Sequence, residues 1–213
     1  RISLFDQPEQ RDSIAMEVMP PRLITFLSSL LQKVAETNDT NRPFDTQMIT
    51  AFHGLTRPTI SLQSYLERIF KYASCSPSCY VVAYVYLDRF SQKQPLVPIN
   101  SLNVHRLLIT SVLVSAKFMD DIYYNNAYYA KIGGITTAEI NLLEVDFLFG
   151  MSFQLNVTPE TFHTYYSYLQ REMMLESPPL HDSLPSLPVL GSKLKAHCCI
   201  SDEDSTHKQS LAV

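Results

Sequence analysis

The sequence predicts an all-α protein, and three observations lead to this fold class. Apolar residues recur at three- and four-residue spacing in several segments of about 12 to 18 residues, which is the period of an amphipathic helix. Pro, Ser or Thr precedes most of these segments, as is common at helix starts. The chain has 213 residues and is 46% hydrophobic, which is enough for one sizeable core. We therefore expect a single bundle of helices.

The N-terminal part is expected to contribute one helix and a long connection. Residues 1–19 are polar, lack a helical period and do not begin with Met, so they are interpreted as a disordered or non-native start. Residues 20–54 are assigned to the N-terminal helix and its connection. The helix is predicted over 22–36 and is opened by the proline pair at Pro20. The connection is expected to hold a short helical piece near Met48.

Two further helices are predicted over 61–72 and 78–90. The first repeats its apolar positions at helical spacing. The second is nearly all apolar, and its length favours a helix although its Val and Tyr content would suit a strand. Ser76 is placed to cap this second helix, with Pro77 at its first position.

The central helix is predicted over 102–119. Much of it is apolar on every side except for three small hydroxyl residues, whose side chains we expect to turn back onto backbone carbonyls, namely Thr110, Ser111 and Ser115. Such a helix has to be wrapped by others. Lys117 follows with no polar transition, and a buried, unpaired ammonium costs several kcal/mol. Lys117 must therefore reach a carboxylate, a carbonyl or a partner protein.

The C-terminal part is predicted to add two helices and a tail. Residues 122–134 are rich in Tyr and Asn and end in two glycines, so they are interpreted as a connection. A helix over 137–149 follows, with a capping box that starts at Thr136. The last helix is predicted over 159–174. Residues 175–213 have no period and are expected to be a disordered tail.

Charge and hydropathy exclude some classes of partner. The net charge is −4 and the basic residues are scattered, so we expect no nucleic-acid or anionic membrane partner. No apolar run reaches the roughly 18 residues of a membrane span, and no signal peptide is recognised. The expected location is the nucleus, the cytoplasm or both.

Signals of catalysis are weak throughout. The chain lacks a phosphate-binding glycine loop, a Gly-x-Ser-x-Gly turn and a His-Glu-x-x-His motif, so we expect no enzyme, no cofactor and no metal. Cys75 and Cys79 lack a second pair that would complete a zinc site, and we interpret them as reduced thiols. Asp120 and Asp121 leave one alternative open, magnesium-dependent diphosphate chemistry, but a third carboxylate is missing.

Six motifs in this order make the pattern specific. Together they resemble a single cyclin box, most closely that of the P- or U-type cyclins of plants, which are relatives of the yeast cyclins of phosphate signalling. The motifs lie at 65–72 (YLERIFKY), 86–90 (YLDRF), 103–108 (NVHRLL), 116–121 (AKFMDD), 126–134 (NAYYAKIGG) and 141–147 (NLLEVDF). The resemblance implies a five-helix cyclin box over residues 55–174, with the helix over 22–36 as an extra N-terminal helix.

The resemblance also implies a function. A cyclin is a non-catalytic regulatory subunit that binds and activates a cyclin-dependent Ser/Thr kinase, in cell-cycle or phosphate signalling, and the partner here would be an A-type plant kinase. In the family, a lysine and a glutamate contact the kinase near its mobile helix, and these fall on Lys117 and Glu144. Phe118 and Leu143 are expected to add apolar contact area. The alternative for Lys117 and Glu144 is an internal salt bridge.

Three aspartates need separate interpretation. Asp120 and Asp121 lie where phosphate-type cyclins present acid to the kinase activation segment, so we expect either that role or a solvated helix end. Asp88 is interpreted as structural, because the arginine that often pairs with it in the family is replaced by Thr59, so it is expected to find another arginine among Arg57, Arg68 and Arg89. A second hypothesis for the whole chain is a helical scaffold or adaptor that does not activate a kinase.

Overall fold

The computed structural model describes residues 8–41 and 47–175, with side chains described from residue 21 onward. Within these ranges the chain forms helices and no strand, as the sequence predicts. The helices are α1 (Pro8–Asn41), α2 (Leu62–Ala73), α3 (Pro77–Lys93), α4 (Val104–Met119), α5 (Asn126–Gly133), α6 (Thr137–Gly150) and α7 (Pro159–Leu175).

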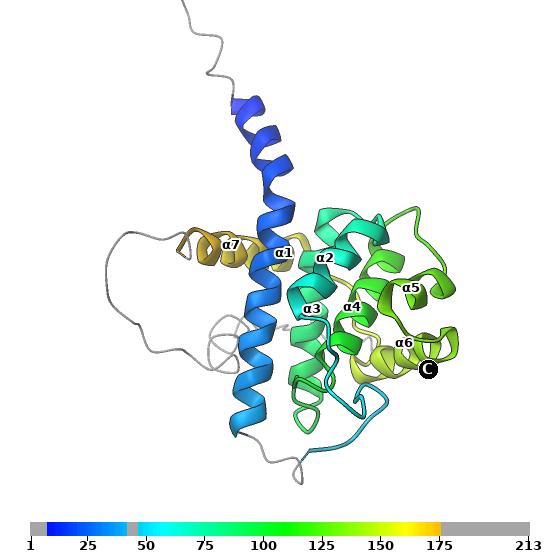
Figure 1. Ribbon diagram of the computed structural model, residues 1–213. Coiled ribbons are helices and arrows are strands. Elements are labelled where there is room, and N and C mark those ends of the chain that lie inside the picture. Colours follow the sequence, from blue (N-terminus) through cyan, green and yellow to red (C-terminus); the bar gives the residue numbers. More distant parts are fainter. Residues whose placement is uncertain (1–7, 42–46, 176–213) are drawn as a thin grey trace, which may run out of the picture. The chain divides into compact units, whose positions relative to one another are not determined.

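Helix α4 is the centre of the bundle. It contacts α2, α3, α5 and α6, and Figure 1 shows α3 on one side of it and α5 and α6 on the other. The three hydroxyl residues of α4 are buried and donate to backbone carbonyls as predicted: Thr110 to Arg106 at 2.7 Å, Ser111 to Leu108 at 2.8 Å, and Ser115 to Val112 at 2.9 Å. The central helix is thus wrapped on all sides without an unsatisfied hydroxyl.

An aromatic cluster closes the core beside α3 and α6. The rings of Phe90 and Phe147 stack with centroids 5.1 Å apart, and Phe52 meets Phe90 edge-on at 5.4 Å. The Cα of Gly150 faces this cluster so closely that a Cβ there would lie 2.5 Å from Phe90 Cε2. Aromatic pairs in these geometries add about 0.5–1.5 kcal/mol beyond the area they bury.

Helix α1 is longer than the sequence predicted. It begins at Pro8, so residues 8–19 are helical where we expected a disordered start, and the proline pair at Pro20 lies inside the helix. A proline inside a helix removes one hydrogen bond and bends the axis without having to end it. Residues 1–7 lie outside the described part of the chain. In Figure 1, α1 runs beside α2 and α7, which it contacts.

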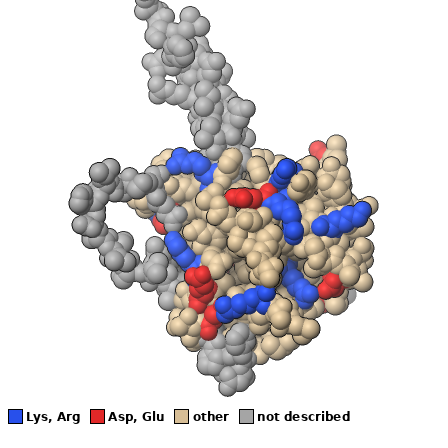
Figure 2. Space-filling model, viewed as in Figure 1, with Lys and Arg blue, Asp and Glu red and all other residues tan. Residues whose placement is uncertain are grey.

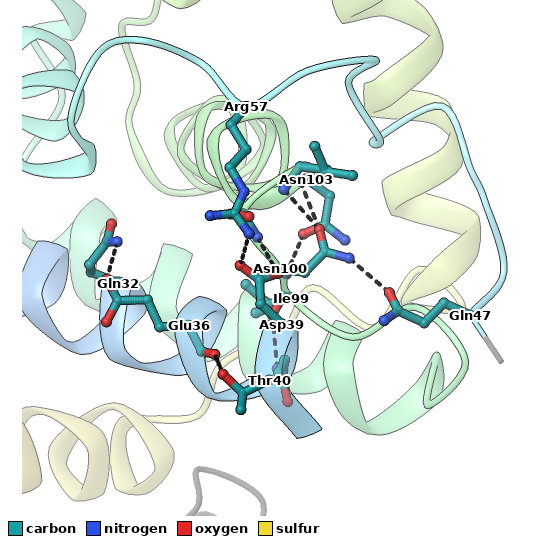
Figure 3. A network of polar contacts seen from close by, with 12 residues as sticks. Gln32, Glu36, Asp39, Thr40, Gln47, Arg57, Ile99, Asn100 and Asn103 are labelled. Atoms are coloured by element: carbon teal, nitrogen blue, oxygen red, sulfur yellow. Dashed lines mark hydrogen bonds and ion pairs between the residues drawn. The ribbon is translucent and has the colours of Figure 1, made fainter. Parts of the chain in front are cut away.

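The C-terminal end of α1 is tied to the turn before α4 (Figure 3). Asn38 Nδ2 donates to Ile99 O at 2.8 Å, and Asp39 accepts from Ser101 N at 3.2 Å and from Arg57 at 2.9 Å. Asn100 continues the network with a 2.8 Å bond to Gln47. These tertiary bonds explain why Asn and Asp, which sequence reasoning assigned to a loop, remain in the helix.

The structure differs from the sequence prediction near Met48 and in residues 122–134. Met48 is not helical, and its N–H donates to Leu96 O at 2.9 Å. The connection predicted over 122–134 contains α5, which Asn125 caps through Tyr128 N and Gly134 ends at φ 68°. Helix α7 ends at Leu175, and the rest of the predicted tail, 176–213, lies outside the described residues.

The structure also bears on membranes and charge. No helix in the described ranges is long and apolar enough to cross a bilayer. Basic and acidic side chains are interspersed on the face shown in Figure 2.

Candidate functional site

Lys117 and Glu144 form an ion pair where α4 ends against α6, which is the internal salt bridge that sequence reasoning kept as the alternative to direct kinase contacts. Lys117 Nζ lies 2.7 Å from Glu144 Oε1 and 2.9 Å from Oε2, so the ammonium bridges both carboxylate oxygens. The two side chains remain 29% and 16% exposed. Of the three partners that the sequence allowed for Lys117, the structure shows a carboxylate, and the ion pair lies at the surface of the bundle.

Two asparagines extend the pair and were missed as site residues by sequence reasoning. Asn126, the first residue of α5, donates to Glu144 Oε2 at 2.7 Å and to Asn141 Oδ1 at 2.7 Å. Both lie in motifs that carried the family resemblance, yet residues 122–134 were interpreted as a connection. Recognition of Asn125 as a helix cap would have placed Asn126 in a fixed first turn. We call Lys117, Glu144, Asn126 and Asn141 the polar cluster.

The capping box of α6 helps to hold Glu144 in place. Thr136 accepts from Glu139 N, and the Glu139 carboxylate accepts from Thr136 N at 2.8 Å, which confirms the prediction. The hydrogen bond from Thr136 N is the main reason why the pKa of Glu139 lies below its usual value. Glu139 also pairs with Arg106 of α4 at 2.9 Å. The Arg106–Glu139 pair therefore joins the start of α6 to α4, five residues before Glu144.

Exposed apolar side chains flank the polar cluster. Phe118, directly after Lys117, is 48% exposed, and Leu142 and Val145, on either side of Glu144, are 53% and 49% exposed. Positions 142, 145 and 149 follow helical spacing, and the ring of Phe149 packs edge-on against Phe153 at 5.1 Å. We call this set the apolar rim: Phe118, Met119, Leu142, Val145, Phe149 and Phe153, all exposed. Large apolar side chains that are exposed at helical spacing are candidates for a protein-binding surface.

Leu143 corrects the predicted contact set. Its side chain is only 2% exposed and belongs to the core with Ile140 and Phe147. Residues 140, 143 and 147 share one face of α6 at helical spacing, and that face packs on the bundle. In this structure Leu142, one residue earlier, is the leucine that reaches the surface.

Asp120 and Asp121 occupy different environments. Asp120 Oδ2 accepts from Ser76 N at 3.0 Å and from Cys79 Sγ at 3.3 Å, so this carboxylate caps α3. Ser76 is the N-cap residue as predicted, but its side chain makes no capping bond. Asp121 is exposed. The two predicted roles, a kinase contact or a solvated helix end, remain open for Asp121, whereas Asp120 is already engaged within the protein.

Asp88 is structural, but its partners differ from those predicted. The carboxylate is buried and accepts from the Tyr165 hydroxyl and from Gln92 Nε2, so α3 is tied to α7. Burial raises the pKa of Asp88 above its usual value, and the two hydrogen bonds oppose that rise. Arg89, one of the arginines expected to pair with it, instead donates to the carbonyls of Gln154 and Asn156 at 2.9 and 2.8 Å.

The described residues contain no group of three or more His, Cys, Asp or Glu side chains that could hold a metal ion. The polar cluster instead suits recognition of a protein, because Lys117 carries N–H donors and the two residues after it, Phe118 and Met119, are exposed apolar side chains.

Comparison with known proteins identifies the family. A family model for cyclins matches residues 11–155, which takes in most of α1 as well as α2 to α6. Cyclin-U4-1 of Arabidopsis thaliana is 61% identical over 198 residues, which cover 90% of this chain and 95% of the relative. Cyclin-U4-2 of the same plant is 64% identical, with 81% of each chain covered, and Cyclin-P4-1 of Oryza sativa subsp. japonica is 56% identical, with 86% and 85% covered. The chain therefore belongs to the cyclin family, whose members are regulatory and not catalytic, and it resembles the U and P types of plants.

Proposed function

We propose that this protein binds and activates a cyclin-dependent Ser/Thr kinase through the polar cluster and the apolar rim. The observation that carries the proposal is the position of the Lys117–Glu144 pair, which is partly exposed and flanked on both helices by exposed apolar side chains. The free energy of a partly exposed ion pair is only about 0–1 kcal/mol, which is little for the fold alone. A partner that covers the pair removes water from it, which costs desolvation energy but strengthens each hydrogen bond that the partner completes.

The proposed mechanism is positional. Lys117 makes two hydrogen bonds to Glu144 and retains one N–H that can be donated to a backbone carbonyl of the kinase. The apolar rim would pack against the mobile helix of the kinase and hold it where the kinase lysine and glutamate that orient the ATP phosphates can pair. The cyclin supplies no reacting group, and its effect is to stabilise the active arrangement of the kinase.

Copurification with a kinase assay tests the proposal. The chain is expressed with an A-type plant cyclin-dependent kinase, the complex is isolated by a tag on the cyclin, and phosphate transfer to a protein substrate is measured. We expect a one-to-one complex and a rise in transfer over the kinase alone. A complex that forms without any rise would favour the scaffold or adaptor role, and the absence of a complex would refute both for this kinase.

We also propose that the protein works in the nucleus, the cytoplasm or both. The free thiols of Cys75 and Cys79 support this proposal, because the nucleus and the cytoplasm keep thiols reduced. Imaging of a fluorescent fusion in plant cells tests it. Whether the pathway is cell division or phosphate signalling is tested by loss of the gene under phosphate-replete and phosphate-poor conditions.

A further inference from the structure

Two free cysteines lie within one turn of each other at the start of α3. Ser76 is the N-cap, so Cys75 directly precedes the helix and Cys79 lies in its first turn. Cys79 is fully buried, whereas Cys75 is partly exposed. The pair therefore combines one thiol that solvent can reach with a second that solvent cannot reach.

The neighbours of Cys79 supply both a hydrogen-bond donor and an acceptor. Its Sγ lies 3.3 Å from Asp120 Oδ2, to which it donates, and 3.4 Å from Ser76 Oγ. The interaction between the two side chains is the main cause that lowers the pKa of the Cys75 thiol and raises that of the Cys79 thiol. Cys75 is therefore the thiol that ionises first, and Cys79 keeps its proton.

The Cys79 and Tyr80 side chains lower the pKa of Cys75, whereas burial and the Asp120 carboxylate oppose this, and the net pKa lies below the usual value. Two buried phenol hydroxyls, those of Tyr80 and Tyr129, make no hydrogen bond within the described part of the chain. Burial raises the pKa of both phenols, and the nearby Cys75 thiol adds to that rise. Tyr80 is placed one turn after Cys75, where a side chain before the helix start meets the helix. The otherwise unpartnered hydroxyl of Tyr80 can therefore donate to a thiolate at Cys75.

We propose that Cys75 and Cys79 form a peroxide-responsive modification site, in which Cys75 is oxidised first and Cys79 then closes a reversible disulfide across the first turn of α3. The partial exposure of Cys75, the burial of Cys79 and the carboxylate acceptor beside Cys79 assign these two roles.

The chemistry balances with hydrogen peroxide as the oxidant. The Cys75 thiolate attacks one peroxide oxygen, an S–O bond forms, the O–O bond breaks, and hydroxide leaves with the electron pair and takes up a proton to become water. The Cys79 sulfur then attacks the Cys75 sulfur and passes its proton toward Asp120. The S–S bond forms, the S–O bond breaks, and the departing oxygen leaves as water. The two thiols lose two electrons and two protons, and one peroxide becomes two waters.

Disulfide formation changes a contact between α3 and α4. Cys79 loses the proton that it donates to Asp120, while the 3.0 Å bond from Ser76 N to Asp120 remains available. Asp120 is the residue directly after α4. Oxidation therefore acts on the junction between the two helices, and a thiol reductant reverses it through the accessible sulfur of Cys75.

Peptide mapping of the full chain tests the proposal without any kinase. The reduced protein is treated with a small excess of hydrogen peroxide, blocked with an alkylating reagent, digested and analysed by mass spectrometry. We expect the peptide that carries Cys75 and Cys79 to lose two hydrogens, to resist alkylation, and to recover both thiols after reduction. In the wild-type chain, Cys198 and Cys199 provide internal references for the rate of oxidation. In a second variant both are replaced by Ser, which removes the disulfides that they could form with Cys75 or Cys79.

Variants and unfolding make the test specific. In Cys79→Ser, the oxidised Cys75 should persist as a sulfenic acid that a dimedone reagent labels, and in Cys75→Ser, Cys79 should stay reduced. In the wild-type chain, urea should abolish the faster reaction of Cys75 relative to Cys198 and Cys199, because the fold causes it. The proposal is overturned if Cys75 in the folded wild-type chain reacts no faster than the other two, or if Cys75 pairs with one of them instead of with Cys79.

Discussion

Replacement of Asp120 by Ala tests whether this carboxylate stabilises the fold. The change removes the acceptor for Ser76 N at 3.0 Å, and the Ser76 side chain does not take its place. Loss of an N-terminal helix cap costs about 0.5–2 kcal/mol, and loss of a negative charge there costs about 0.3–1 kcal/mol more. Helix α3 is largely buried, so we expect Asp120→Ala to lower the free energy of unfolding by about 1–3 kcal/mol.

Urea unfolding followed by circular dichroism measures the effect, and thermal unfolding should show a decrease of about 2–4 °C per kcal/mol. Asp121→Ala is the matched control, because Asp121 is exposed, and its stability should stay within about 0.5 kcal/mol of wild type. Asp120→Asn keeps an oxygen acceptor but loses the charge, so it should fall between the two. Equal stabilities for Asp120→Ala and Asp121→Ala would refute the capping role.

Four further substitutions test the core and the apolar rim. Gly150→Ala puts a Cβ 2.5 Å from Phe90, so despite the better helix propensity of Ala we expect a loss of about 1–3 kcal/mol in urea unfolding, and a stabilised variant would contradict this. Because the pKa of Asp88 is raised in the folded protein, its contribution to the free energy of unfolding is fully present below the ordinary carboxyl pKa and is lost as the pH rises through the raised value. Between about pH 4 and pH 7, the stability of Asp88→Asn should therefore rise relative to that of wild type. Parallel profiles of stability against pH for the two proteins would argue against this. Leu143→Ala should lower the free energy of unfolding by about 2–5 kcal/mol, because Leu143 is buried, whereas Phe118→Ala should mainly weaken kinase binding in a titration. A stable Leu143→Ala variant together with a destabilised Phe118→Ala variant would overturn the assignment of rim and core.

Helical period and local caps predicted most of the fold, because both depend on residues close in sequence. The central helix, the hydroxyl bonds of Thr110 and its neighbours, and the capping box at Thr136 are as expected. The extent of α1 was not predictable in this way, because Asn38 and Asp39 remain helical through bonds to residues about 60 positions later. Helix α5 was missed because its eight residues are too short to show a convincing period.

The site was predicted only in part, because some of its contacts join residues far apart in the sequence. The family resemblance brought Lys117 and Glu144 to one site, and the ion pair that they form was the alternative to direct contact with a kinase. The role of Asp120 depends on Ser76, 44 residues earlier, and no local pattern indicates that contact. The burial of Leu143, in contrast, was predictable from the sequence, because helical spacing puts it on the same face as Ile140 and Phe147. That spacing is stronger evidence than the proximity of Leu143 to Glu144 along the chain.

Kinase binding by a variant that lacks the Lys117–Glu144 pair tests the central claim most directly. Lys117→Ala with Glu144→Ala is compared with wild type and with Arg171→Ala with Glu172→Ala, which removes a charge pair on α7 whose atoms lie 3.5 Å apart. We predict that the first variant loses at least about tenfold in kinase affinity, or about 1.4 kcal/mol, and fails to activate, while its free energy of unfolding changes by less than about 1 kcal/mol. The control should behave as wild type. Normal binding and activation by the Lys117 and Glu144 variant would contradict the proposal and reduce the pair to an internal salt bridge.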